Sequence, residues 1–365
     1  MYSARRSAWA GFDFPLLAAV VVTSLFGLAM VHSAVRGSPG LEGSVQRQAV
    51  FLVVSLVLAV LVSTVDYRLL VGSSAILYGL GLASLLVVLV LGAIQHGGQR
   101  WIQVGGVTFQ PSEVMKVILL LALAQYLGPR SDGPSRLHYL IVSGAITAVP
   151  LLLVYAQPDL GTAVVLLVIW AGAVFVAGVS LWQVGLLGVV GLAASPLIWL
   201  NLEDYMRDRV LALVRPDHNP QASFVVEQAL IGIGSGSIWG KGYASGSQSQ
   251  LHFLRVRHTD FIFSVIGEEL GFVGAVMTMA LLVFICWRLF GVAETAPDGA
   301  GRIIASGVAV MIAFQTLVNV GMNLGWLPVT GLPLPFISVG GSAVLAQFLG
   351  IGLAESVAAH RLAPS

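Results

Sequence analysis

The sequence predicts an all-α integral membrane protein with ten transmembrane helices in a single polytopic domain, residues 1–365. Of its 365 residues, 57% are hydrophobic and only 10% are charged, whereas an average soluble protein has about 25% charged residues. Ten apolar runs approach the length of about 20 residues that a helix needs to cross a bilayer. The runs lie near 14–35, 47–65, 69–94, 112–128, 137–156, 159–179, 181–200, 260–289, 302–324 and 336–358.

The arginines of the short loops predict that both termini face the cytoplasm. With the N-terminus inside, the cytoplasmic side carries Arg5, Arg6, Arg68, Arg130, Arg136, Arg288, Arg302 and Arg361, and the short loops of the other side carry only Arg36, Arg47 and Arg100. The first run is too long for a cleaved secretory signal and predicts a retained helix. The polar segment 201–259, between helices 7 and 8, then forms one large extracytoplasmic loop.

Charge and cysteine content exclude several classes of function. A net charge of +1 and the lack of a basic tail argue against nucleic-acid binding. The single cysteine, Cys286, excludes an internal disulfide, zinc or iron–sulfur framework. The two halves show no internal repeat, which argues against a secondary transporter.

Asp260 lies where the long loop meets the eighth apolar run. One interpretation is a helix N-cap, because aspartate accepts hydrogen bonds from the first turn of a helix. The other is a functional acid at the membrane edge, since Arg257 and His258 precede it. Glu268 and Glu269 follow about 12 Å further along the same helix. Acids inside an apolar segment must be paired or face water, so they predict a polar cavity.

A second charged group opens the fourth run. Glu113 and Lys116 follow Pro111 at positions i and i+3 and lie on one helix face. A surface pair of this kind would matter little, but the first turn of a membrane helix requires protein or water around it, so surface and cavity roles stay open. Asp159, by contrast, is expected to be an ordinary helix cap.

The outer segments divide into three parts. Residues 203–215 predict an amphipathic helix along the membrane interface. A short helix from Phe224 leads into a glycine-rich turn with Lys241, which could cradle phosphate through backbone N–H groups, although the spacing matches no nucleotide motif. The segment 321–341 has prolines at 328, 333 and 335, cannot be helical, and must pack in protein or line a cavity.

Five motifs occur in order: RWIQVGGVTFQPSEVMK, QPDLGTA, FVVEQALIGIGSGSIWGKG, RHTDFIFSVIGEELG and NLGWLPVTGLPLPFISVGGS. Together they resemble the SEDS family (shape, elongation, division and sporulation) of membrane glycosyltransferases, and Pro333 is similar to its elongation branch. Two departures occur. Arg255 and Val256 replace the usual Pro-Glu before the Arg-His-Thr-Asp motif, and the final motif has Val339 and Ala343 for the usual tyrosine and serine.

The resemblance implies an enzyme of the bacterial cytoplasmic membrane that polymerises lipid II, an undecaprenyl pyrophosphate-linked disaccharide-pentapeptide, into β-1,4-linked glycan for elongation and rod shape. Its catalytic aspartate falls on Asp260. The paired cavity residues fall on Glu113 and Lys116. The remaining expected substrate-binding or cavity residues are Gln110, Arg207, Arg209, Lys241, His258, Thr259 and Ser338. Of these, Lys241, Arg207 and Arg209 are expected to bind the pyrophosphate of the lipid substrate.

The implied partner is a class B penicillin-binding protein, a single-span transpeptidase. No cofactor is expected with certainty, and a divalent cation at the pyrophosphate is left open. Two other functions fit an apolar bundle with a polar interior: a lipid II flippase, which should tolerate Asp260→Asn, and a non-enzymatic scaffold for the transpeptidase, which should need neither Asp260 nor Glu113.

Overall fold

The computed structural model describes residues 11–36, 41, 43–95, 98–104, 107–130, 137–200, 202, 204–214, 220–250 and 257–361. Several predicted features lie outside the described residues: Arg5, Arg6 and Arg136, the replaced pair Arg255 and Val256, and the two ends of the predicted helix 203–215.

A helix occupies each of the ten predicted apolar runs. These helices are α1 (Phe14–Val35), α2 (Ser44–Thr64), α4 (Ser74–Leu91), α5 (Pro111–Leu127), α6 (Leu137–Ala156), α7 (Leu160–Val176), α8 (Leu181–Leu200), α12 (Ile262–Glu294), α13 (Gly299–Asn323) and α14 (Gly341–His360). Among the described residues, eight of the helices are long and apolar enough to cross a membrane. The chain is therefore a multi-pass membrane protein, and crossing by α7 and α8 stays a prediction.

The connections contain structure that the apolar pattern did not predict. A short helix, α3 (Tyr67–Gly72), precedes α4, so the run 69–94 is divided. Between α4 and α5 the chain forms an antiparallel sheet of β1 (Ala93–Gln95), β2 (Gly98–Val104) and β3 (Val107–Phe109). The all-α prediction is therefore right for the bundle and incomplete for this loop.

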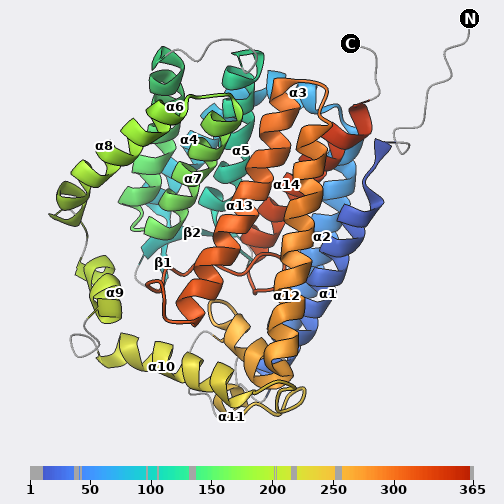
Figure 1. Ribbon diagram of the computed structural model, residues 1–365, viewed down its shortest axis with the longest axis vertical. Helices are drawn as coiled ribbons and strands as arrows, with labels where there is room; N and C mark the ends of the chain where they lie inside the picture. The colour runs from blue at the N-terminus through green and yellow to red at the C-terminus, as the bar shows by residue number, and fades with distance from the viewer. Residues whose placement is uncertain are drawn as a thin grey trace, which may run out of the picture.

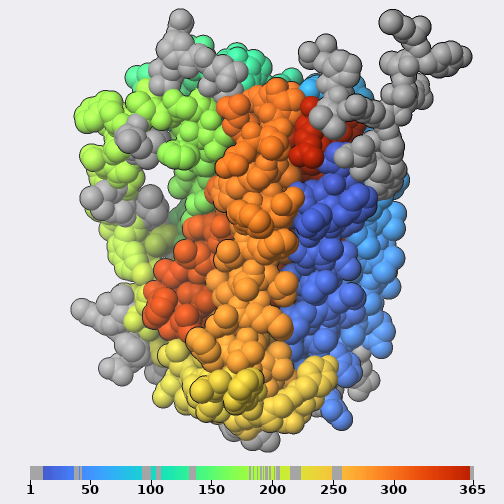
Figure 2. Space-filling model, turned by 45° about the vertical axis from the view of Figure 1, so that its right-hand side comes forward, coloured from blue at the N-terminus to red at the C-terminus, as the bar shows by residue number. Residues whose placement is uncertain are grey.

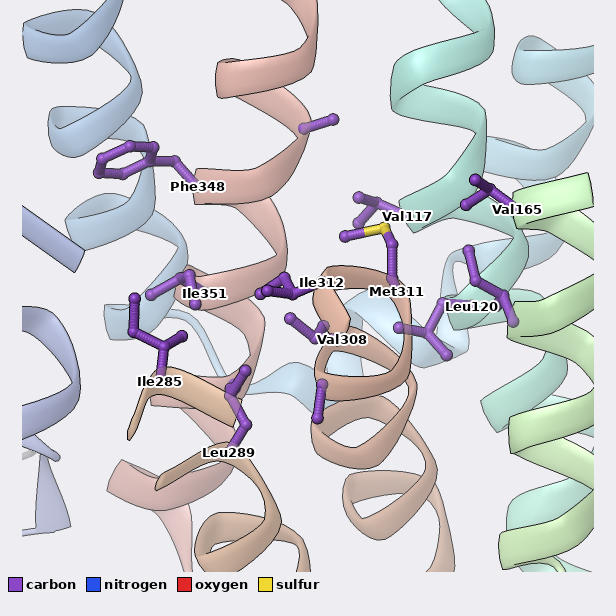
Figure 3. Packing of buried hydrophobic residues seen from close by; sticks show 14 of the residues in the cluster. Val117, Leu120, Val165, Ile285, Leu289, Val308, Met311, Ile312, Phe348 and Ile351 are labelled. Atoms are coloured by element: carbon purple, nitrogen blue, oxygen red, sulfur yellow. The ribbon is translucent and has the colours of Figure 1, made fainter. Parts of the chain in front are cut away.

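The centre of the bundle is α13, which packs against α5, α7, α12 and α14. Figure 3 shows apolar side chains from these helices meeting around Val308, Met311 and Ile312 of α13. Peripheral helices instead expose large apolar side chains, such as Val90 and Leu91 of α4. An apolar exterior around a packed centre is the distribution that a surrounding bilayer favours.

The ends of the bundle differ in character. α1 begins and α14 ends at the upper end in Figure 1, while α9 (Asp204–Val214), α10 (Pro220–Ser235) and α11 (Ser247–Gln250) gather at the lower end. In Figure 2 the yellow segment that follows α9 lies across the lower ends of α12 and α1. The start of the first helix and the end of the last helix thus lie at the same end of the bundle, and the long loop covers the opposite end. This arrangement is the one that the orientation prediction requires.

α12 is broken near its start. Gly271 has φ 65° and ψ −161°, which is outside the helical region and suits glycine. Residues 262–270 therefore form a short half-helix that is separate from the long remainder of α12. The predicted run 260–289 is continuous in hydropathy, but its helix is not.

Candidate functional site

Asp260 lies in the turn just before the half-helix, one residue ahead of the N-cap position. The N-cap of α12 is Phe261, which makes no side-chain cap bond. The backbone N–H of Ser264 donates to Oδ1 of Asn323 at 3.1 Å, so a first-turn donor is bound from α13. The helix therefore begins one residue later than the capping interpretation expected, and the choice between a cap and a functional acid stays a prediction.

The backbone of this turn is fixed by α13. Nδ2 of Asn319 and Nδ2 of Asn323 donate to the carbonyl oxygen of Asp260 at 3.1 and 2.9 Å. Both asparagine side chains have 0% exposure. Sequence reasoning missed them, although two polar residues four apart in an apolar run are themselves a signal of a site.

Residues of the proline-rich segment bind the backbone carbonyl oxygens of the two residues that precede Asp260. The hydroxyl of Ser338 donates to the carbonyl oxygen of Thr259 at 2.6 Å, and the backbone N–H of Val339 donates to that of His258 at 3.0 Å. His258, Thr259 and Ser338 are thus brought together, by backbone contacts in the case of the first two. The segment is irregular and packed within protein, as its prolines predicted.

The side chain of Asp260 faces a small space beside Gly331. A methyl group built on Gly331 would lie 3.8 Å from both Oδ2 of Asp260 and Nη1 of Arg209. Arg209, on α9, also donates to the carbonyl oxygen of Val329 at 3.1 Å. Arg209 and Arg100 line one small pocket between α9, the start of α7 and the 328–330 segment. The structure therefore gathers an acid and two guanidinium groups in neighbouring positions.

Gln110 belongs to a network at the start of α7. Its Nε2 lies 2.9 Å from Oδ2 of Asp159 and 3.1 Å from Oγ of Ser112. Oδ1 of Asp159 accepts from the backbone N–H of Thr162 at 3.1 Å, which confirms the predicted cap. Nη1 of Arg100 lies 3.8 Å from the same Oδ1. Asp159 therefore does more than cap α7, because it also holds Gln110 and Arg100.

Glu113 and Lys116 form a direct ion pair in the first turns of α5. The distance from Nζ to Oε2 is 2.7 Å, and the whole residues are 3% and 1% exposed. This is a buried pair, so the surface alternative is wrong. Its cavity role stays a prediction.

Lys241 of the long loop forms an ion pair with Glu268 of the half-helix. Nζ of Lys241 lies 2.9 Å from Oε1 of Glu268, which is fully buried and also accepts from the backbone N–H of Gln248. Glu269, fully buried as well, accepts from Oγ of Ser33 at 2.6 Å. The adjacent acids are thus paired inside the protein, whereas the sequence predicted that they line a polar cavity.

The glycine-rich turn packs against the break in α12. The backbone N–H groups of Lys241 and Gly242 donate to the carbonyls of Glu268 and Glu269 at 3.0 and 2.9 Å. The sequence suggested that backbone donors of this turn could cradle phosphate, but these two are used within the fold. Glycine lets the backbone of the turn lie directly against the backbone of the half-helix, since a Cβ on Gly240 would lie 2.1 Å from the Glu269 carbonyl oxygen.

Arg207 lies on α9 with Arg209 but contacts a different element. Its Nε and Nη2 donate to the carbonyl oxygens of Trp199 and Leu200, at 3.2 and 2.6 Å, at the end of α8. Of the three predicted pyrophosphate-binding cations, Arg209 is therefore the one that lies beside Asp260. Among the described residues, no group of three or more His, Cys, Asp or Glu side chains is arranged to hold a metal ion.

Similar proteins are found by sequence. The chain is 38% identical over 321 residues to the peptidoglycan glycosyltransferase MrdB of Escherichia coli, covering 87% of this chain and 86% of the relative. It is 36% identical over 358 residues to a probable peptidoglycan glycosyltransferase FtsW of Nitrosomonas europaea, covering 93% and 91%.

Solved structures share the fold. A chain of a peptidoglycan synthase complex, studied for its coordination of polymerization and crosslinking, matches with a TM-score of 0.83 and 34% identity, covering 98% of this chain and 100% of that one. The rod shape determining protein RodA of Thermus thermophilus matches with a TM-score of 0.74 and 34% identity, covering 98% and 99%.

The family model described as "Cell cycle protein", which takes in FtsW, RodA and SpoVE, matches residues 14–362. This match spans nearly the whole chain and agrees with the relatives found by sequence and by structure. The chain therefore belongs to the FtsW, RodA and SpoVE family, the SEDS proteins.

Proposed function

We propose that this chain is a peptidoglycan glycosyltransferase that polymerises lipid II into β-1,4-linked glycan, with Asp260 as the general base. The observation that carries the proposal is the carboxylate of Asp260, held beside Arg209 in a turn whose backbone is fixed. The relatives MrdB and FtsW, which bear the name peptidoglycan glycosyltransferase, support the same activity.

The reaction is a single displacement that inverts the donor sugar. The donor is joined to pyrophosphate through an α link and the product is β, so one carboxylate is sufficient. Asp260 takes the proton of the acceptor 4-hydroxyl as that oxygen bonds to the anomeric carbon. The bond between that carbon and the phosphate oxygen breaks, and undecaprenyl pyrophosphate leaves with the electron pair. General base assistance of this kind contributes about 10²- to 10⁴-fold.

The departing pyrophosphate needs positive charge close to Asp260. Arg209 meets this need best, with Arg100 in the same pocket, because guanidinium groups bind phosphate oxygens in a bidentate manner. Arg207 and Lys241 are retained as outer contacts of the lipid headgroup, although Lys241 would have to be shared with Glu268. Whether a divalent cation binds at the pyrophosphate stays open.

The setting follows from the family and the arrangement of the loop. Asp260, α9 and α10 would face outside the cytoplasmic membrane, with both termini in the cytoplasm and the chain crossing ten times. A transpeptidase of the class B penicillin-binding type is the proposed partner, supported by a structural neighbour that belongs to a synthase complex. Pro333 and the likeness to MrdB support a role in elongation.

Purified protein incubated with lipid II in detergent tests the activity. Long glycan strands formed without any partner would support a polymerase. Transport of lipid II across the membrane of vesicles without glycan synthesis would instead indicate a flippase. The absence of both activities would indicate a non-enzymatic scaffold.

A further inference from the structure

The carbonyl oxygen of Asp260 accepts two side-chain donors from consecutive turns of α13. The donors are Nδ2 of Asn323 at 2.9 Å and Nδ2 of Asn319 at 3.1 Å. Both asparagines are fully buried. Two donors on one oxygen use both of its lone pairs, so they fix the orientation of the peptide plane in addition to satisfying the oxygen.

We propose that Asn319 and Asn323 are positioning residues for Asp260, a role that rests on the proposed general-base function. The two asparagines fix the peptide plane that follows Asp260, and the hydroxyl of Ser338 holds the preceding plane through the carbonyl oxygen of Thr259. With both planes held, the direction of the Cα–Cβ bond is fixed, and Asp260 keeps only its side-chain torsions. The carboxylate is then directed to the space beside Gly331 that Arg209 also borders. Placement matters because a shift of about 1 Å in a reacting group can cost about 100-fold in rate.

Each asparagine also ties Asp260 to a second element. Oδ1 of Asn323 accepts from the backbone N–H and the hydroxyl of Ser264, at 3.1 and 2.6 Å, so it holds the turn and the half-helix together. Nδ2 of Asn319 donates to the carbonyl oxygen of Leu332 at 2.9 Å. Leu332 follows Gly331 directly. The pair therefore sets the carboxylate relative to the wall of the space that it faces.

A purely structural role would predict different kinetics. Asn319→Leu and Asn323→Leu keep the approximate volume and remove every side-chain hydrogen bond. Ser356→Ala is the matched control, because buried Ser356 accepts from the backbone N–H of Tyr67 at 3.0 Å and donates to the carbonyl oxygen of Val65 at 2.5 Å. It removes these two bonds and a longer contact with Nδ1 of His360 at 3.4 Å, near the end of α14 and away from Asp260.

The test is steady-state polymerisation of lipid II, with a melting temperature for every variant. Each leucine variant should lower kcat about 10- to 100-fold and leave KM within about twofold. Ser356→Ala should lower the melting temperature to a similar extent without lowering kcat. If a leucine variant fails to fold, Asn323→Ser, which keeps a shorter donor, should still lower kcat relative to the wild type and leave KM within about twofold.

A double-variant comparison completes the test. In an Asp260→Glu background the carboxylate is already displaced by one methylene. Each asparagine variant should therefore lower kcat less than about threefold relative to Asp260→Glu alone. An unchanged kcat in the asparagine variants, or the same loss in both backgrounds, would overturn the positioning role. Full activity of Asp260→Ala would instead remove the general-base function itself, whatever the asparagine variants do.

Discussion

Nζ of Lys116 lies 2.7 Å from Oε2 of Glu113, and the two side chains are only 1% and 5% exposed. This ion pair joins the first and second turns of α5 inside the bundle. Its charges meet little water, so each depends on the other. Removing one partner of such a pair costs about 3–5 kcal/mol, because the remaining charge is buried without compensation.

Glu113→Ala and Lys116→Ala are each expected to lower the melting temperature strongly and to reduce polymerisation. The double variant Glu113→Gln with Lys116→Met leaves no unpaired charge and should be more stable than either single variant. Thermal melting of the purified proteins measures both effects. Wild-type stability in the two single variants would show that the pair is dispensable.

Arg209 and Lys241 should differ in how their loss affects the enzyme. Arg209→Ala should raise the KM for lipid II about 10- to 100-fold, since a charge-assisted hydrogen bond contributes about 1.5–3 kcal/mol. Lys241→Ala should mainly lower the melting temperature, because it leaves the buried carboxylate of Glu268 without its cation. The KM for lipid II and the melting temperature, measured for both variants, distinguish substrate binding from structural support. A large rise in KM with unchanged stability for Lys241→Ala would restore Lys241 as the main pyrophosphate contact.

The glycine-rich turn offers a sharp comparison. A Cβ on Gly236 would lie 1.9 Å from the carbonyl oxygen of Gly267, whereas one on Gly234 would have nothing within 4 Å. Gly236→Ala should therefore destabilise the protein by about 1–3 kcal/mol or more, because the half-helix must move. Gly234→Ala, within α10, should stabilise it by about 0.5–1 kcal/mol. Equal melting temperatures for the two variants would contradict this packing.

The sequence was sufficient to predict most helix positions. The observed bounds of α6 and α8 are the predicted runs 137–156 and 181–200, because each run is apolar over a length that suits one helix. The ion pair in α5 was equally predictable, since its partners lie one turn apart. These features depend on residues that are near each other in the chain.

Other features depend on contacts between distant segments. The break at Gly271 lies in a sequence that reads as continuous helix, and it is stabilised by the backbone of residues 236–242. Lys241 was expected to meet a phosphate, but its partner Glu268 lies 27 residues away. Asn319 and Asn323 contact Asp260 from 59 and 63 residues away, a relationship that only the packing of α13 reveals.

The central claim is that Asp260 acts as a general base. The direct measurement is glycan polymerisation from lipid II by purified Asp260→Asn and Asp260→Ala proteins whose melting temperatures match that of the wild type. Asn replaces the carboxylate with an amide of the same shape that cannot accept the proton. Both variants should lose at least about 100-fold in kcat, which is the lower bound of general base assistance. Full activity of the Asp260→Asn protein would contradict the account.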